Sequence, residues 1–226
     1  MGYVDMFKKK LCGWLQENHI ELYNSSLKLQ KFLFFYECFS KVKGLPYDFS
    51  GLKGYLQGPV FSSIYGCYTK EREWFDIEVY NLFHMDLSFQ GRVMDDLTVD
   101  QAAFLCNIMT ESEISEITHH MNIWSAKADR IRAGEKQVPL DESDFNEADT
   151  CFVTDLSRMY SRELIDNMYV VPVMNKRFLF SKNDAKDLTD EHRFVLRELV
   201  EKCSDELVNP VYAEIDKELG GITIID

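Results

Sequence analysis

The sequence predicts a mainly α-helical protein: a compact helical domain with one or two short β-hairpins, followed by a C-terminal helical extension. Apolar side chains recur three or four residues apart in several segments, which is the spacing of one helix face. Apolar residues make up 46% of the 226 residues and aromatic residues 13%, enough for a full core. We expect the helical domain over residues 1–165 and the extension over residues 166–226.

Two amphipathic helices open the chain. The first is expected over residues 3–17, with apolar positions at Val4, Phe7, Leu11, Trp14 and Leu15. Asn24, Ser25 or Ser26 can cap the second, because their side-chain oxygens accept hydrogen bonds from free backbone N–H groups. Apolar residues cover most of the surface of this second helix, so we expect it in the middle of the core. Gly44 is expected to end it.

The segments after this helix give weaker signals. Residues 47–57 are short and mixed, and predict one or two short strands with turns at the glycines. Gly58-Pro59 then predicts a helix start, because proline is tolerated in the first helical turn. Residues 74–90 fit a strand or irregular structure equally well.

Clearer helices follow in the middle of the chain. Thr98 is expected to cap one, in a capping box with Gln101. Residues 110–119 predict another, with acidic residues in the first turn. Residues 134–149 predict an exposed loop that leads into a helix at about 150–165.

The extension combines a hairpin with a long helix. Residues 170–173 and 177–180 resemble the two strands of a short hairpin. Thr189 is expected to cap a final helix over residues 190–218, which Pro210 can kink or divide. Gly220 and Gly221 end this helix, and the last residues form an apolar tail.

Charge and cysteine usage limit the class of protein. The net charge is −13, with +3 in residues 1–75 and −16 in residues 76–226. An acidic body disfavours direct nucleic-acid binding, which needs basic surface, and suits a basic protein partner. The six scattered cysteines, without a Cys-x-x-Cys pair, are typical of free thiols in a reducing compartment. With no apolar run long enough for a signal peptide or a membrane span, we expect a cytoplasmic protein without membrane contact.

The candidates for chemistry are weak. His119 and His120 are adjacent, so they point about 100° apart on a helix and do not easily share one metal ion. Glu116 with His120 supplies at most half of a metal site. No cysteine has a local partner for nucleophilic catalysis, and no phosphate or dinucleotide loop occurs. We therefore expect no catalytic residue, no metal and no cofactor.

Three segments together resemble a known family. Residues 28–35, KLQKFLFF, are similar to a helix of the "KLQKLLYF" type. Gly58-Pro59-Val60 with Ile64-Tyr65 after it is similar to a "GPV…vY" segment, and residues 115–119 with Trp124 are similar to an "LTH…W" segment. In this order the segments resemble the Panacea domain of SocA-like antitoxins and phage-associated proteins. The sequence departs from that pattern at Tyr55, where the family has tryptophan, and at Ile117, where it has leucine.

The resemblance covers about residues 1–165 and implies a mostly helical binding module without catalytic residues. Members neutralise protein toxins by direct contact, some deliver a toxin to a protease, and many are encoded in prophages. The expected function is therefore that of an antitoxin in a toxin–antitoxin system, bound to a cognate and basic protein toxin. Two alternatives stay open: a phage-encoded interaction protein or proteolytic adaptor that binds a host factor, and an enzyme whose site the sequence does not reveal.

The expected partner surface is acidic. Five carboxylates lie close together in the loop before the helix at about 150, with no basic residue among them: Asp141, Glu142, Asp144, Glu147 and Asp149. We expect these residues, or the acidic final helix, to face the basic toxin. The alternative for each residue is that it belongs to a solvated acidic loop.

Overall fold

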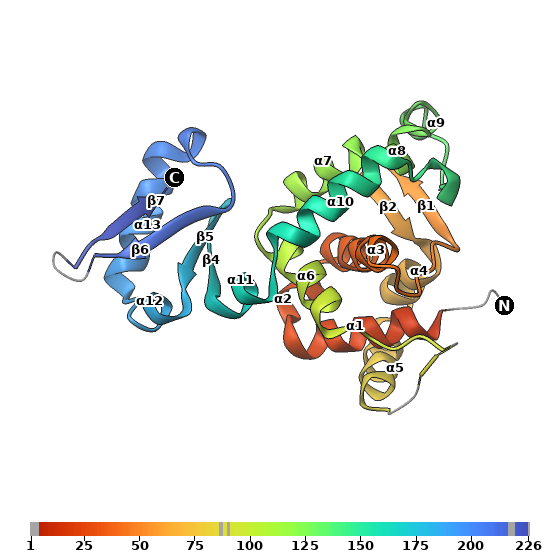
Figure 1. Ribbon diagram of the computed structural model, residues 1–226, viewed down its shortest axis with the longest axis horizontal. Coiled ribbons are helices and arrows are strands. Elements are labelled where there is room, and N and C mark those ends of the chain that lie inside the picture. The colour runs from red at the N-terminus through yellow and green to blue at the C-terminus, as the bar shows by residue number, and fades with distance from the viewer. Residues whose placement is uncertain (1–4, 86–87, 90, 217–219, 226) are drawn as a thin grey trace. The chain divides into compact units, whose positions relative to one another are not determined.

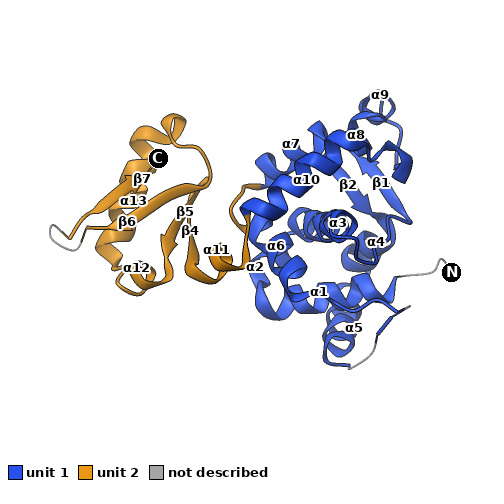
Figure 2. Cartoon of the chain, viewed as in Figure 1, with its two compact units in different colours: residues 1–106, 111–159 blue, residues 107–110, 160–226 orange. Residues whose placement is uncertain are grey.

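The computed structural model describes residues 5–85, 88–89, 91–216 and 220–225. Within it the chain divides into two compact units (Figure 2). Unit 1 consists of residues 1–106 and 111–159, and unit 2 consists of residues 107–110 and 160–226. Unit 1 is mainly helical and includes a small sheet, and unit 2 packs a helix against a larger sheet.

Unit 1 is built around one buried helix. Helix α3 (Ser26–Val42) lies in its middle and contacts α1 (Met6–Asn18), α2 (Ile20–Asn24), α4 (Ser62–Lys70), α7 (Glu111–His120) and α10 (Glu147–Met159) (Figure 1). Ser25 caps α3 by accepting from the Lys28 N–H at 3.1 Å, and the apolar pattern predicted both the helix and its central place. Asp5 caps α1, so the helix begins at Met6. The first residues of the segment expected to be helical, 3 and 4, lie outside the described part of the chain.

The predicted helix start at Gly58-Pro59 is wrong. Strand β1 (Leu52–Tyr55) pairs antiparallel with β2 (Gly58–Phe61), and β3 (Val138–Pro139) pairs with the other side of β1. The strand order β2-β1-β3 places Pro59 in an edge strand, where a residue without an N–H is tolerated. Gly58, with φ of 102°, makes the reversal between the two strands. Helix α4 begins only at Ser62.

Two of the middle segments also differ from the expectation. The segment left undecided at 74–90 is helix α5 (Arg72–His84), although residues 86, 87 and 90 lie outside the described part. Helix α6 (Asp96–Asn107) begins before Thr98, and the predicted Thr98 cap is wrong. Asp95 accepts from the Thr98 N–H at 2.8 Å, so an aspartate performs the capping role. Helix α7 confirms the helix expected at 110–119.

The rest of unit 1 consists of the short elements α8 (Asn122–Ser125), α9 (Ala128–Arg132) and the 3₁₀ turn η1 (Glu142–Asp144), followed by the longer helix α10. The single helix expected at about 150–165 is two helices, α10 and α11 (Arg162–Asn167). The second helix begins where Ser161 caps it by accepting from the Leu164 N–H.

Unit 2 confirms the hairpin and corrects the C-terminus. Strands β4 (Met168–Val173) and β5 (Lys176–Ser181) form the expected hairpin. After α12 (Lys182–Lys186), Thr189 caps α13 (Asp190–Cys203) as predicted, in a capping box with His192. The helix ends well before residue 218, and the 3₁₀ turn η2 (Ser204–Glu206) leads to β6 (Val211–Ile215) and β7 (Ile222–Ile225). The expected helical extension is therefore wrong, since the C-terminus is made of strands.

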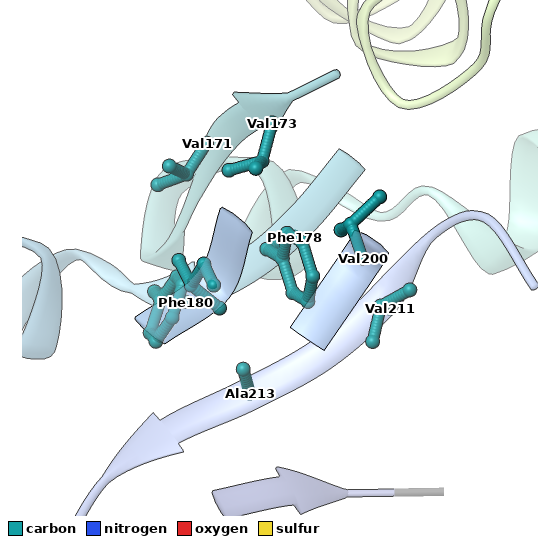
Figure 3. Close-up of a cluster of buried hydrophobic side chains, with 8 residues drawn as sticks. Val171, Val173, Phe178, Phe180, Val200, Val211 and Ala213 are labelled. Atoms are coloured by element: carbon teal, nitrogen blue, oxygen red, sulfur yellow. The ribbon is translucent and has the colours of Figure 1, made fainter. Parts of the chain in front are cut away.

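The sequence after Pro210 explains why the C-terminus forms strands rather than a helix. Pro210 cannot donate to a helix, and after it buried Val211 and Ala213 alternate with exposed Tyr212 and Glu214. The sheet order is β4-β5-β6-β7, with β5 and β6 parallel. Buried side chains of β4, β5, β6 and α13 form one core (Figure 3): Val171, Val173, Phe178, Phe180, Leu196, Val200, Val211 and Ala213.

Candidate functional site

The turn between β1 and β2 is held by side chains from distant parts of unit 1. Lys31 Nζ donates to the Gln57 carbonyl at 2.5 Å, and Ser115 Oγ donates to the same oxygen at 3.0 Å. Trp124 Nε1 donates to the Tyr55 carbonyl at 3.0 Å. We name this place the hairpin junction. Its donors come from the first and third motif segments, and its acceptors directly precede the second segment at Gly58, so the three segments meet at one place in the fold.

Gly58 allows these groups to approach the turn. A Cβ atom built on Gly58 would lie 2.2 Å from Lys31 Nζ and 2.4 Å from Thr118 Oγ1. Both distances are far below van der Waals contact, and the φ of 102° is one that other residues avoid. The glycine is therefore required by the backbone conformation and by the close contacts together.

Gln30 holds the second strand of the hairpin. Its Oε1 accepts from the Phe61 N–H at 2.8 Å, and this bond fixes which end of the amide is oxygen. Its Nε2 is buried and has no acceptor among the described residues. A buried donor without an acceptor costs free energy. Gln30 therefore offers an unused hydrogen-bond donor beside the junction.

His119 and Trp124 form a stacked pair next to the junction, with ring centroids 4.1 Å apart. Burial lowers the pKa of His119 below its usual value, so the ring is neutral near pH 7. His120 instead contacts the Glu116 carbonyl of its own helix through Nδ1. Within the described part of the chain, no three His, Cys, Asp or Glu side chains are grouped as metal ligands.

A cavity of about 550 Å³ adjoins the junction. Gln30 and Lys31 line it from α3, Val60 and Tyr65 from the strand and helix that follow the turn, and Ile131 from α9. The wall is mostly apolar, which is typical of ligand-binding pockets of this size. A second hollow of about 690 Å³ shares Leu27, Leu56 and Gln57 with it: its other lining residues are Glu111, Ser112, Ser115, Glu116 and His119.

Burial controls the electrostatics of the cavity. Lys31 is about 1% exposed, and desolvation lowers its pKa to about 7. The nearby Cys106 thiol has its pKa raised to about 12 by burial, so it stays neutral. Lys28, one turn earlier on α3, donates to the Cys106 carbonyl at 3.0 Å. Lys31 is therefore a buried amine that titrates near neutral pH.

A separate buried charge cluster stabilises unit 1. The fully buried Glu37 carboxylate accepts from Arg92 Nη1 at 3.1 Å, from Arg92 Nη2 at 2.6 Å and from the Asp48 N–H at 2.8 Å. Lys8 Nζ lies 3.3 Å from the same carboxylate. Since the Glu37 charge is balanced and its carboxylate oxygens are hydrogen-bonded internally, the cluster is structural.

The five acidic residues expected to face a partner lie in different environments. Asp149 is buried, and its carboxylate accepts from the N–H groups of Asn122 and Ile123 at the start of α8. Asp141 and Asp144 form ion pairs with Lys127 at 3.3 and 2.9 Å. The other two of the five, Glu142 and Glu147, are exposed.

Glu142 is exposed and pairs with Lys41 at 2.7 Å while it accepts from Tyr47 Oη. Glu147 is also exposed, in the first turn of α10. Exposed carboxylates are therefore present at Asp141 and Glu142 in the loop and at Glu147 in α10, whereas Asp149, also in α10, caps α8 and does not reach the surface.

Helix α5 carries an exposed apolar row that was not predicted from the sequence. Trp74, Ile77 and Tyr80 are 76%, 56% and 51% exposed and are spaced three residues apart. Residues on the opposite side, Phe75 and Val79, are buried against the rest of unit 1. We name the exposed row the α5 stripe. The signal was present as helical spacing, but the segment had not been assigned to a helix.

None of the described helices combines the length and hydropathy that a membrane crossing requires. Searches with protein-family models, against curated proteins and against solved structures each found no match for this chain.

Proposed function

We propose that this protein is an antitoxin that neutralises a basic protein toxin by direct binding, without catalysis. The resemblance of its three motif segments to the Panacea domain first suggested this function. The observation that carries the proposal is the α5 stripe, which places a tryptophan, an isoleucine and a tyrosine on one exposed helix face. Tryptophan and tyrosine are the residue types that most often dominate protein–protein binding energy.

Charge supports a basic partner. Exposed Glu71 and Glu73 precede the stripe on the chain, and Glu17 of α1 lies 3.3 Å from His84 at the end of α5. An apolar centre with carboxylates beside it suits a partner surface that has an apolar pocket with lysine or arginine around it. The exposed acids of the loop, Asp141, Glu142 and Glu147, extend the acidic character of unit 1.

The first experiment is co-expression with the neighbouring gene, followed by affinity capture and a growth assay. An antitoxin binds the neighbour's product and restores growth that the product alone stops. A harmless neighbour that does not co-purify would contradict the antitoxin proposal and favour a host protein as partner.

Variants then test the stripe. Trp74→Ala and Tyr80→Ala should each weaken toxin binding about 30-fold, the factor that corresponds to about 2 kcal/mol for a dominant contact. Phe194→Ala is the matched control, because Phe194 is an aromatic residue of unit 2 that is 60% exposed on α13. If all three variants bind the toxin as tightly as the wild-type protein, the α5 stripe is not part of the interface.

A further inference from the structure

The cavity beside the hairpin junction has a mostly apolar wall that includes a few polar side chains. Leu27, Val60, Tyr65 and Ile131 supply apolar surface. Gln30 and Lys31, adjacent on α3, supply hydrogen-bond donors. The cavity of about 550 Å³ falls within the size range of small-molecule sites. A mostly apolar wall with a few hydrogen-bond donors suits a ligand that is itself amphipathic.

The polar side chains of the wall include donors that the described part of the protein leaves unused. Gln30 is about 2% exposed, and its Nε2 has no acceptor among the described residues although its Oε1 is engaged by Phe61. Lys31 Nζ donates to the Gln57 carbonyl, which Ser115 Oγ also uses. A protonated lysine has three N–H donors. Both groups therefore call for an acceptor, and the lysine favours an anionic one.

Among the described residues that influence the charge of Lys31, none supplies the opposite charge. Cys106 of α6 is neutral because burial raises its pKa, and His119 of α7 is neutral because burial lowers its pKa. Glu135, the one carboxylate among the described residues that line the cavity, is paired with Arg130 through two hydrogen bonds of 2.8 and 2.6 Å. Lys136 adds positive charge at the lining.

We propose that this cavity binds a small apolar carboxylate, whose carboxyl group accepts hydrogen bonds from Gln30 Nε2 and Lys31 Nζ and whose apolar body contacts Leu27, Val60 and Tyr65. The same chemistry is present in a free organic acid and in the C-terminal residue of a peptide. This inference is independent of the antitoxin proposal, because its residues lie inside unit 1 and not on the α5 stripe.

Calorimetric titration of the full-length protein with octanoate, and with octan-1-ol as the uncharged analogue, tests the site. Octanoate should bind at pH 6 and lose about tenfold or more in affinity at pH 8.5, because Lys31 loses its proton over this range. Octanol should bind at least about tenfold more weakly at pH 6, since it lacks the charge. Equal affinity for both ligands, or no heat from either at millimolar concentration, would overturn the proposal.

Two variants locate the binding. Gln30→Glu keeps the acceptor for the Phe61 N–H and replaces the donor with a group that repels a carboxylate, so octanoate binding should be lost. Val60→Trp fills the cavity from a partly exposed edge-strand position and should have the same effect even if the first variant is poorly folded. Val208→Trp, on an 80% exposed residue of unit 2, is the control. Unchanged octanoate affinity in the Val60 variant would place any binding elsewhere and contradict the proposal.

A tripeptide that ends in leucine separates the two sources of the ligand. Binding of its free-acid form but not its amide, together with weak octanoate binding, identifies a peptide terminus. Tight octanoate binding without peptide binding identifies a free acid. Either result supports the carboxylate site, and binding of the amide as tight as that of the acid would refute it.

Discussion

Replacing Gly58 with alanine tests the geometry of the hairpin junction most directly. The new methyl group would lie 2.2 Å from Lys31 Nζ and 2.4 Å from Thr118 Oγ1, so both side-chain ends must move. Moving Lys31 breaks its buried bond to the Gln57 carbonyl, a loss of about 1–3 kcal/mol. Forcing alanine into positive φ costs about 1–2 kcal/mol more. We expect Gly58→Ala to lower the free energy of unfolding by about 3 kcal/mol.

Two other glycines separate these contributions. Gly51 has φ of 75° and open space around its Cβ position, so Gly51→Ala should cost only the conformational share of about 1 kcal/mol. Gly66 lies inside α4 with nothing near its Cβ position, so Gly66→Ala should stabilise unit 1 by about 0.5–1 kcal/mol. From the most to the least stable, the expected order is therefore Gly66→Ala, wild type, Gly51→Ala and Gly58→Ala.

Urea unfolding followed by tryptophan fluorescence is the assay. Trp14, Trp74 and Trp124 are the three tryptophans of the sequence, and all belong to unit 1, so the signal reports the unit that contains the junction. The shift of the midpoint at constant slope gives the change in stability. A Gly58→Ala variant that is no less stable than Gly51→Ala would show that the close contacts with Lys31 and Thr118 are not formed.

Three further predictions follow from buried and exposed charges. Burial lowers the pKa of Lys31 to about 7, so between pH 7 and the usual pKa of 10.5 the unfolded chain binds more protons than the folded one, and this lysine makes stability rise with pH. Lys31→Met should therefore flatten the rise in urea midpoint between about pH 7.5 and 8.5. An unchanged pH dependence of the midpoint would contradict a neutral buried lysine. Glu37→Ala leaves the buried Arg92 guanidinium without its carboxylate, although Lys8 keeps its ion pair with Asp5 at 2.6 Å, and should cost about 3–5 kcal/mol of unfolding free energy, whereas a loss below about 1 kcal/mol would show that the cluster is solvated. Reversing the charges of Asp141, Glu142, Asp144 and Glu147 together, with the capping Asp149 kept, should weaken binding to a basic toxin most at low ionic strength; affinity equal to wild type at low salt would exclude the loop from the interface.

Local signals in the sequence predicted the elements that local chemistry determines. The cap at Ser25, the apolar face of α3 and the capping box at Thr189 depend on residues within one or two turns, and the structure confirms them. Gly58-Pro59 failed because the same pair suits a helix start or an edge strand. The choice depends on the hairpin with β1, whose other side is paired by β3 (Val138–Pro139) from a distant part of the chain.

The prediction of a helical C-terminus was wrong for a related reason. Val211 and Ala213 alternate with polar or exposed neighbours, but the run is short and follows a strongly amphipathic helix. Its strand character becomes evident from its parallel partner β5, more than thirty residues earlier. Long-range pairing overrode the extrapolated helical period.

The candidate site was visible only in part. The acidic loop was found from composition, yet composition cannot separate exposed Glu147 from Asp149, which is buried because α8 presents its N–H groups there. Gln30 and Lys31 were noted as motif residues, but their contacts with Phe61 and Gln57 require the folded hairpin. The α5 stripe needed only a correct helix assignment.

The hairpin junction also has a consequence for biosynthesis. Its bonds join residues that are 26, 58 and 69 positions apart in the chain, from Lys31 to Gln57, from Gln57 to Ser115 and from Tyr55 to Trp124. A ribosome must therefore release the chain beyond Trp124 before the turn can be closed. Until then Lys31 keeps its ordinary proton affinity and α3 lacks part of its cover. A nascent chain that stops short of this point exposes a helix that is buried from Lys28 to Ser40 in the folded unit, which makes it a substrate for chaperones and proteases rather than a partial copy of the folded unit.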